Sequence, residues 1–137
     1  MKTKNFLAVL SAIFMSAVLM SFIGLQDQKK GGPWDVPAAY KSKKAPASTA
    51  QSVNLGKMLW AKHCKSCHGN NGLGDGPKAA SLKTLPGNFK AAEFQGQPDG
   101  AIYYQSFVGR DEMPNFEKKV VDEEERWALV HFIRTLK

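Results

Sequence analysis

The sequence predicts a small all-α domain that follows an apolar N-terminal segment and a polar linker. Helical periodicity recurs in the second half of the chain, whereas no strand pattern or internal repeat is visible. The length of 137 residues suits one domain with extensions, and a hydrophobic content of 43% is enough for a core. We therefore divide the chain into residues 1–25, 26–51 and 52–137.

The first segment is typical of an export signal. Lys2 and Lys4 precede an uncharged run of 20 residues from Phe6 to Leu25. This run is longer than the roughly 7–15 residues of a cleaved signal, and it reaches the roughly 20 that span a bilayer. We expect the rest of the chain to lie on the periplasmic side. An N-terminal anchor formed by residues 6–25 is favoured over a removed signal peptide.

Residues 26–51 are rich in Lys, Pro, Ala, Ser and Gly and show no hydrophobic periodicity. This composition is typical of an extended tether. Trp34, Val36 and Tyr40 are exceptions. Two interpretations stay open for them: they fasten the linker to the domain or the membrane interface, or they are scattered along a mobile segment.

Two helices are predicted before the C-terminal one. The first runs from about Val53 to Cys64, with Ser52 or Asn54 as its cap. Gly56 inside it costs about 1 kcal/mol against Ala, which indicates close approach by another helix. A short helical turn is expected over 78–82, and an irregular segment over 85–94. The second helix runs over 99–108, capped by its first residue, Asp99.

The last helix has the clearest pattern. Asp122 is its predicted N-cap, and acidic residues in the first turn suit the positive end of the helix dipole. Apolar residues then recur at i, i+3, i+4 and i+7, namely Leu129, Phe132, Ile133 and Leu136.

The residues Cys64-Lys65-Ser66-Cys67-His68 have the spacing of a c-type haem attachment site. Each thiol can add to one haem vinyl group, and His68 can then ligate the iron from the same turn. A redox CxxC expects a βαβ context, a structural zinc site needs four ligands, and a lone local disulfide does little for a small domain. The haem interpretation is therefore preferred, with haem c and iron as cofactors.

Met113 is the predicted sixth ligand, because it lies in a loop between two predicted helices and precedes Pro114. The alternative is a Met that fills a gap in the core. His63 and His131 are not expected to bind iron: His63 is predicted to point away from the haem, and His131 is predicted to be a partly exposed helical residue.

These features resemble class I cytochrome c over about residues 53–136. The resemblance rests on Gly56 with Trp60, the CxxCH motif at 64–68, Met113-Pro114 and the C-terminal helix with its aromatic residues. It implies a helical domain wrapped around one covalent haem, with the first and last helices crossing at Gly56. It also implies that the Pro77 carbonyl accepts the ring N–H of His68.

The leader, the linker and the loop before Pro77 are similar to those of exported or membrane-tethered bacterial cytochromes. No residue matches the Trp that binds a haem propionate in the family. Arg110, Asn88 and Tyr104 are the candidates for that contact.

The predicted function is one-electron transfer between respiratory or dehydrogenase partners, without catalysis or a small-molecule substrate. An open sixth site, as in a peroxidase-like enzyme or a sensor, is one alternative. An electron-transfer subunit of a larger complex is another.

The charge of the chain bears on its partners. The net charge is +7, and without Lys2 and Lys4 it is 17 basic against 12 acidic residues, or +5. This favours acidic redox proteins, with membrane association through residues 6–25. Nucleic acid is not expected, because no basic stripe with interleaved aromatic residues appears.

Overall fold

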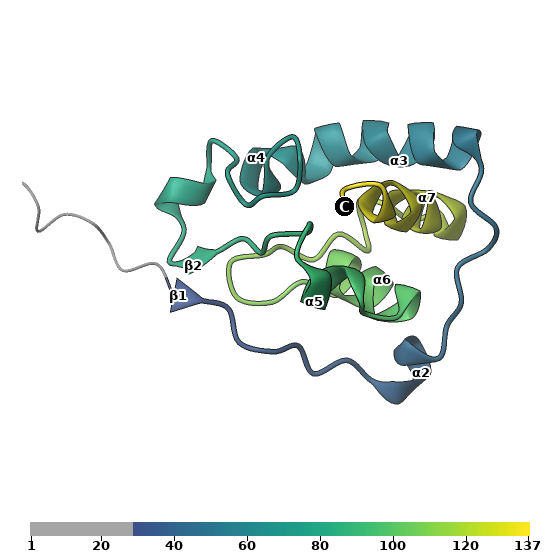
Figure 1. Ribbon diagram of the computed structural model, residues 1–137, viewed down its shortest axis with the longest axis horizontal. Coiled ribbons are helices and arrows are strands. Elements are labelled where there is room, and N and C mark those ends of the chain that lie inside the picture. Colours follow the sequence, from purple (N-terminus) through teal and green to yellow (C-terminus); the bar gives the residue numbers. More distant parts are fainter. Residues whose placement is uncertain (1–28) are drawn as a thin grey trace, which may run out of the picture.

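Two crossing helices, α3 and α7, form the frame on which the rest of the chain is arranged (Figure 1). The computed structural model describes residues 29–137, so the predicted leader lies outside the described residues. The elements are β1 (Lys29–Lys30), α2 (Ala38–Lys41), α3 (Ala50–His63), α4 (Lys65–His68), the 3₁₀ turn η1 (Ala79–Ser81), β2 (Thr84–Leu85), α5 (Ala92–Gln95), α6 (Asp99–Val108) and α7 (Glu123–Arg134).

Helix α3 begins three residues before the predicted start, at Ala50. The predicted caps Ser52 and Asn54 are wrong, because Thr49 is the N-cap. The Thr49 hydroxyl accepts a hydrogen bond from the Ser52 amide at 3.1 Å, and the Thr49 amide donates to the Ser52 hydroxyl at 3.0 Å. This reciprocal pair satisfies two groups that the first turn would otherwise leave unpaired. Ser52 is thus the second partner of the capping pair.

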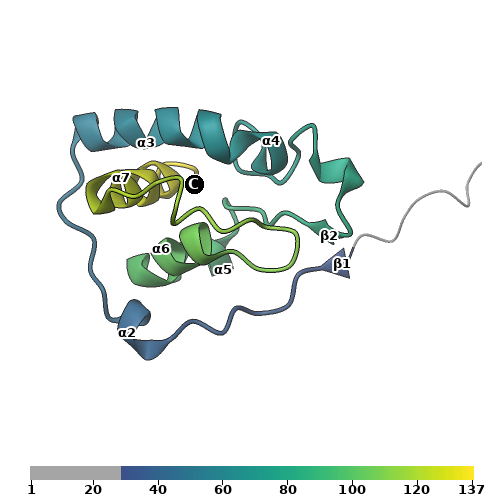
Figure 2. The ribbon, with the colours of Figure 1, turned by 180° about the vertical axis from the view of Figure 1, so that it is seen from behind.

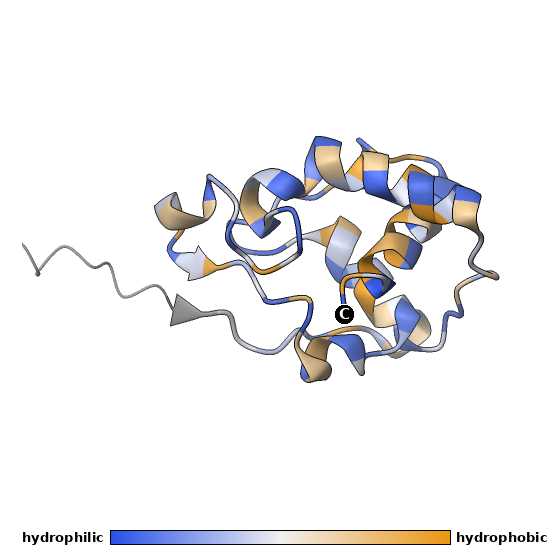
Figure 3. Cartoon of the chain, turned by 45° about the horizontal axis from the view of Figure 1, so that its top comes forward, coloured by the Kyte–Doolittle hydropathy of each residue, from blue (hydrophilic) through white to orange (hydrophobic). Residues whose placement is uncertain are grey.

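The predicted close crossing at Gly56 is confirmed. A β-carbon placed on Gly56 would lie 2.0 Å from the carbonyl oxygen of Ala128 and 2.8 Å from the β-carbon of Phe132, both on α7. Only glycine lets the two backbones approach this closely. The buried residues of α3 are Gly56, Leu59 and Trp60, at the spacings of three and four that place them on one face, while hydrophilic residues occupy other positions along the helix (Figure 3).

The start of α7 is also as predicted, because Asp122 is the N-cap and accepts a hydrogen bond from the Glu124 amide at 2.8 Å. The cap predicted for α6 is wrong. Asp99 is the first helical residue and makes no cap hydrogen bond; its carboxylate instead accepts two bonds from Arg134 of α7, at 2.6 and 2.8 Å. This pair ties the start of α6 to the end of α7.

The core lies between α3, α6 and α7. Its largest fully buried side chains are Phe107 and Ile102 from α6, Ile133 and Val130 from α7, and Val120 from the segment between these helices. Trp60 of α3 is 2% exposed and lies against Phe132 and Phe89. The predicted all-α class is therefore right for the domain.

The only strands among the described residues are β1 and β2, which the sequence did not predict. They form a parallel pair of two residues each, with Lys29 opposite Thr84 and Lys30 opposite Leu85. Because the paired residues are 55 positions apart, no local sequence pattern predicts that these two strands pair. No helix within residues 29–137 is long and apolar enough to cross a membrane.

Residues 31–49, which we call the strap, follow the outside of the domain from β1 to the start of α3 (Figures 1 and 2). Val36 is 4% exposed, and the ring of Tyr40 packs against Tyr103 and Tyr104 of α6. The carbonyl oxygen of Tyr40 lies so close to Gly100 that a β-carbon there would be 1.8 Å away. Of the two interpretations of the linker aromatic residues, the structure supports the one that fastens them to the domain.

Candidate haem site

The CxxCH motif forms a turn of its own rather than the end of the first helix. At Cys64 the backbone leaves the geometry of α3, with φ −114°, and α4 then carries the next four residues. The amides of Cys67 and His68 both donate to the Cys64 carbonyl, at 3.2 and 3.0 Å. Gly69, with φ +79°, ends the turn in a conformation that favours glycine. One turn of helix therefore carries both thiols and the imidazole.

Both cysteines are free thiols and partly buried. Burial raises the pKa of the Cys64 thiol to about 12, and the neighbouring Cys67 adds to this shift. Redox-active CxxC pairs need the opposite, a thiolate stabilised by a lowered pKa. The electrostatics of this turn therefore disfavour the redox interpretation of the motif.

His68 meets the requirements of an iron ligand. Burial lowers its pKa to about 4, so the ring is neutral at physiological pH, as a metal-binding imidazole must be. The ring packs against Phe89 and Trp60, with centroid distances of 4.7 and 5.8 Å. Its Nδ1 is buried and has no hydrogen-bond partner among the described residues. A neutral, partly buried imidazole next to two thiols fits covalent haem attachment, and its unpaired Nδ1 is the atom expected to donate to the Pro77 carbonyl.

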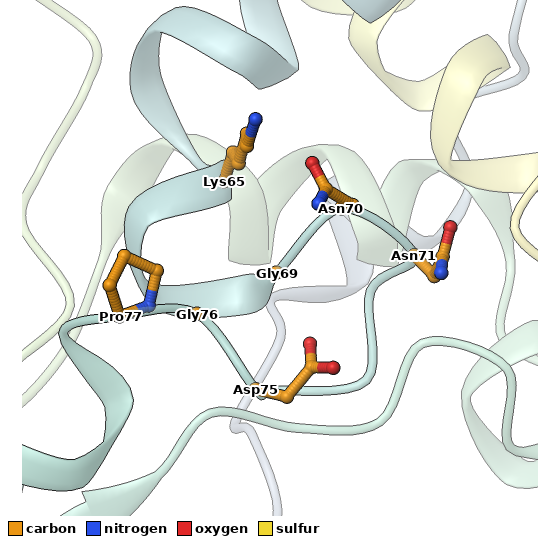
Figure 4. Close-up of a pocket in the computed structure, with 7 residues that line it drawn as sticks. All are labelled: Lys65, Gly69, Asn70, Asn71, Asp75, Gly76 and Pro77. Atoms are coloured by element: carbon orange, nitrogen blue, oxygen red, sulfur yellow. The ribbon is translucent and has the colours of Figure 1, made fainter.

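Pro77 lies beside α4 (Figure 4). Its two neighbours hold it there: the Gly76 amide donates to the Cys67 carbonyl at 3.2 Å, and the Lys78 amide donates to the Ser66 carbonyl at 2.9 Å. The expected bond from the ring of His68 to the Pro77 carbonyl is not present, since Nδ1 of His68 has no hydrogen-bond partner within residues 29–137. That bond stays a prediction for the haem-bound protein.

The Gly-rich loop that follows α4 is anchored to α3 by a tryptophan. The indole Nε1 of Trp60 donates to the Gly69 carbonyl at 3.0 Å. Within the loop, the Gly74 amide donates to the His68 carbonyl at 3.0 Å, and the Phe89 amide donates to the Gly72 carbonyl at 2.7 Å. No local pattern in the sequence indicates that Trp60 and Phe89 hold this loop next to His68.

Met113 lies in the segment 109–116 between α6 and α7, which we call the ligand loop. The Met113 amide donates to the Arg110 carbonyl at 2.8 Å, and the Phe116 amide donates to the Phe107 carbonyl at 2.8 Å. The loop extends toward the end of the molecule that holds α4 and β2 (Figures 1 and 2). Met113 itself is partly exposed, and its ligation to iron stays a prediction.

The three candidates for a propionate contact all have protein partners. Arg110 donates to the carbonyls of Gly32 and Pro33 in the strap. The side chain of Asn88 accepts from the Lys90 amide at 2.9 Å, and the ring of Tyr104 packs against Trp34 and Tyr40. Their contact with haem stays a prediction.

The prediction that His131 is partly exposed is wrong, because it is 6% exposed. Its Nδ1 lies 2.8 Å from the Ser52 hydroxyl, and its Nε2 lies 3.0 Å from the Pro46 carbonyl. Both nitrogens are thus engaged between α7, α3 and the strap. His63 packs against the ring of Phe116. Within residues 29–137, no cluster of three or more His, Cys, Asp or Glu side chains is arranged to hold a metal ion.

A turn that presents two thiols and a partly buried, neutral imidazole is typical of a protein that attaches haem covalently. The sequence profile described as "Cytochrome c" matches residues 53–137, which include this turn, the ligand loop, α7 and all but the first three residues of α3. The chain belongs to the cytochrome c family and is a haem c electron-transfer protein, with iron as its redox metal. No curated protein matches the chain significantly.

Proposed function

We propose that this cytochrome carries single electrons between redox proteins, with His68 and Met113 as the two axial ligands. The observation that carries the proposal is the turn at residues 64–68, which holds both thiols beside a neutral His68 whose ring packs against Phe89 and Trp60. Haem c supplies the one-electron chemistry by alternating between Fe(III) and Fe(II).

Each residue of the site has a distinct part in this proposal. Cys64 and Cys67 would hold haem c through thioether bonds, and His68 would bind its iron. Met113 would be the second iron ligand, and a thioether paired with an imidazole raises the reduction potential. Since both axial positions are then filled by the protein, no substrate binds and little reorganises during transfer. The rings of Trp60 and Phe89 pack against His68 and hold it in place.

Carbon monoxide tests the axial ligation. The wild-type protein is expected to show a low-spin visible spectrum, oxidised and reduced, that does not change with carbon monoxide. Met113→Ala is expected to bind carbon monoxide readily. Met58→Ala is a matched control, because Met58 is 64% exposed on α3 and its loss should leave the spectrum unchanged.

The same experiment separates the electron carrier from an enzyme or a sensor. A haem with an open sixth position is the common feature of peroxidase-like and gas-sensing haem proteins. If the wild-type protein bound carbon monoxide as readily as Met113→Ala, Met113 would not be the ligand. The carrier proposal would then give way to a ligand-binding haem.

Acidic redox proteins are the partners that this surface suits. Six lysines flank the haem-binding segments in sequence, and all six are exposed: Lys57, Lys62, Lys65, Lys78, Lys83 and Lys90. Exposed charges of one sign steer an oppositely charged protein toward its docking face and raise the association rate. We place the docking face around the haem edge, in a free carrier or in a subunit of a larger complex.

Export to the periplasmic side is proposed from residues 1–25 alone. The basic start and the 20-residue apolar run support it. Retention in carbonate-washed membranes would favour an anchor at residues 6–25, whereas a mature N-terminus beyond residue 25 would show that the segment is a cleaved signal. Haem attachment in a strain that cannot export the chain would contradict the localisation.

A further inference from the structure

The strap and the ligand loop are joined by one side chain, Arg110. Its guanidinium group donates through Nη1 to the Pro33 carbonyl at 2.7 Å, and through Nη2 to the Gly32 carbonyl. The same group lies over the ring of Trp34, with 4.2 Å between the guanidinium carbon and the ring centroid. Two charge-assisted hydrogen bonds and a cation–π contact therefore link residues that are more than 70 positions apart.

Trp34 is in turn fixed on the body of the domain. Its ring makes an edge contact with Tyr104 of α6, with centroids 6.5 Å apart. Val36, two residues further on, is buried, and Tyr40 packs on the same helix. The ring below Arg110 is thus in contact with α6 as well as with the guanidinium group.

The ligand loop contains no helix or strand, so its conformation depends on contacts with residues outside the loop. The Phe107–Phe116 hydrogen bond closes its base, and Gly109 and Asp111 have positive φ values of 71° and 49°. At its tip, the carboxylate of Glu112 accepts from the Thr84 amide at 2.9 Å. Arg110 and Met113 form the two sides of a tight turn, through the amide–carbonyl bond between them. A restraint on Arg110 therefore acts directly on the backbone of Met113.

From these contacts we infer that Trp34 and Arg110 are positioning residues that hold the ligand loop closed and so keep Met113 in place at the sixth position. The inference rests on the proposed ligation by Met113. It gives the strap a specific part in the site: removing the Trp34–Arg110 contact lets the loop open, and an external ligand then competes better for the iron.

Imidazole binding to the oxidised, haem-loaded protein tests this inference. The apparent affinity of an external ligand scales with the fraction of molecules in which the sixth position is free. We expect Trp34→Ala to lower the imidazole dissociation constant about tenfold. This change corresponds to a loss of about 1.4 kcal/mol from the free energy that favours the closed loop over the open one. The near-infrared band of Met-ligated ferric haem should weaken in parallel, and the reduction potential should fall. Arg110→Ala should behave like Trp34→Ala.

Lys43→Ala is the matched control. Lys43 is also a strap residue and also lies over aromatic rings, those of Tyr40 and Tyr103, but it pairs with Glu123 at the start of α7. Its loss should leave imidazole affinity unchanged. If Trp34→Ala fails to assemble with haem, Trp34→Leu keeps apolar bulk but offers no ring to the guanidinium. It should bind imidazole more tightly than the wild-type protein does.

The outcomes separate the inference from the proposal on which it rests. Met113→Ala should bind imidazole far more tightly than the wild type. If it does so while the Trp34 variants keep the wild-type value, only the positioning inference is overturned. An effect of Arg110→Ala without an effect of Trp34→Ala overturns it as well, because Arg110 would then act on the haem directly. An unchanged affinity in Met113→Ala overturns the ligation itself, and the inference with it.

Discussion

The crossing of α3 and α7 at Gly56 provides a severe test of the packing. In Gly56→Ala the new β-carbon would lie 2.0 Å from the Ala128 carbonyl oxygen and 2.8 Å from the β-carbon of Phe132. To bring the new β-carbon and the Ala128 carbonyl oxygen to an ordinary contact distance, the two helices must separate locally by about 1.5 Å. Neither neighbour is the end of a flexible side chain, so rotamer changes cannot absorb the clash.

The expected cost follows from two opposing terms. Overpacking at a rigid contact costs about 3 kcal/mol, at the upper end of the usual range. The higher helix propensity of Ala offsets about 1 kcal/mol of this destabilisation. The net loss of about 2 kcal/mol corresponds to a fall in the melting temperature of about 8–16 °C for a domain of this size. The haem-loaded variant should therefore unfold at clearly lower temperature and denaturant concentration, followed by far-UV circular dichroism.

Gly87→Ala is the control for this substitution, since a β-carbon there would meet nothing within 4 Å. Its stability should stay within about 0.5 kcal/mol of the wild-type value. The reasoning is refuted if Gly56→Ala is as stable as Gly87→Ala. Because α3 leads directly into Cys64, a displaced α3 should also shift the reduction potential in Gly56→Ala but not in the control.

Two other predictions concern the cofactor and the partners. The Cys64→Ala, Cys67→Ala double variant should show little helical signal and no cooperative melt by far-UV circular dichroism, because a domain of this size buries little without haem; a native-like melt would contradict this. The association rate with an acidic redox protein should fall steeply as ionic strength rises, since exposed charges are screened beyond about 10 Å at 0.1 M salt. A rate that does not depend on salt would exclude steering by the lysines.

The features that sequence alone predicted are those with a local signal. The CxxCH spacing at 64–68 predicted the turn that carries the site, because the hydrogen bonds that form it run from the amides of Cys67 and His68 to the carbonyl of Cys64 within the same five residues. The Asp122 cap was predicted for the same reason. Gly56 could be interpreted without coordinates, since a helical glycine has a cost that only a close neighbour explains.

Local signals also gave wrong predictions for the N-caps of two helices, α3 and α6. Ser52 and Asn54 were plausible caps for the first helix, yet Thr49 takes that position. Asp99 had the residue type of a cap, but Arg134 lies close enough to engage its carboxylate instead. A side chain that could cap a helix can also bind other polar groups that the fold brings near it. Those groups cannot be identified from spacing along the chain.

The sequence by itself determined the all-α class and the covalent attachment turn, because these depend on residues within a few positions of one another, and the cost of a helical glycine showed that another helix must come close at Gly56. Only the tertiary structure decided the part played by the strap. Its contacts join Arg110 to Trp34 and His131 to Pro46, across 76 and 85 positions of the chain. Contacts at that separation arise from the packing of the whole domain, so neither composition nor periodicity reveals them.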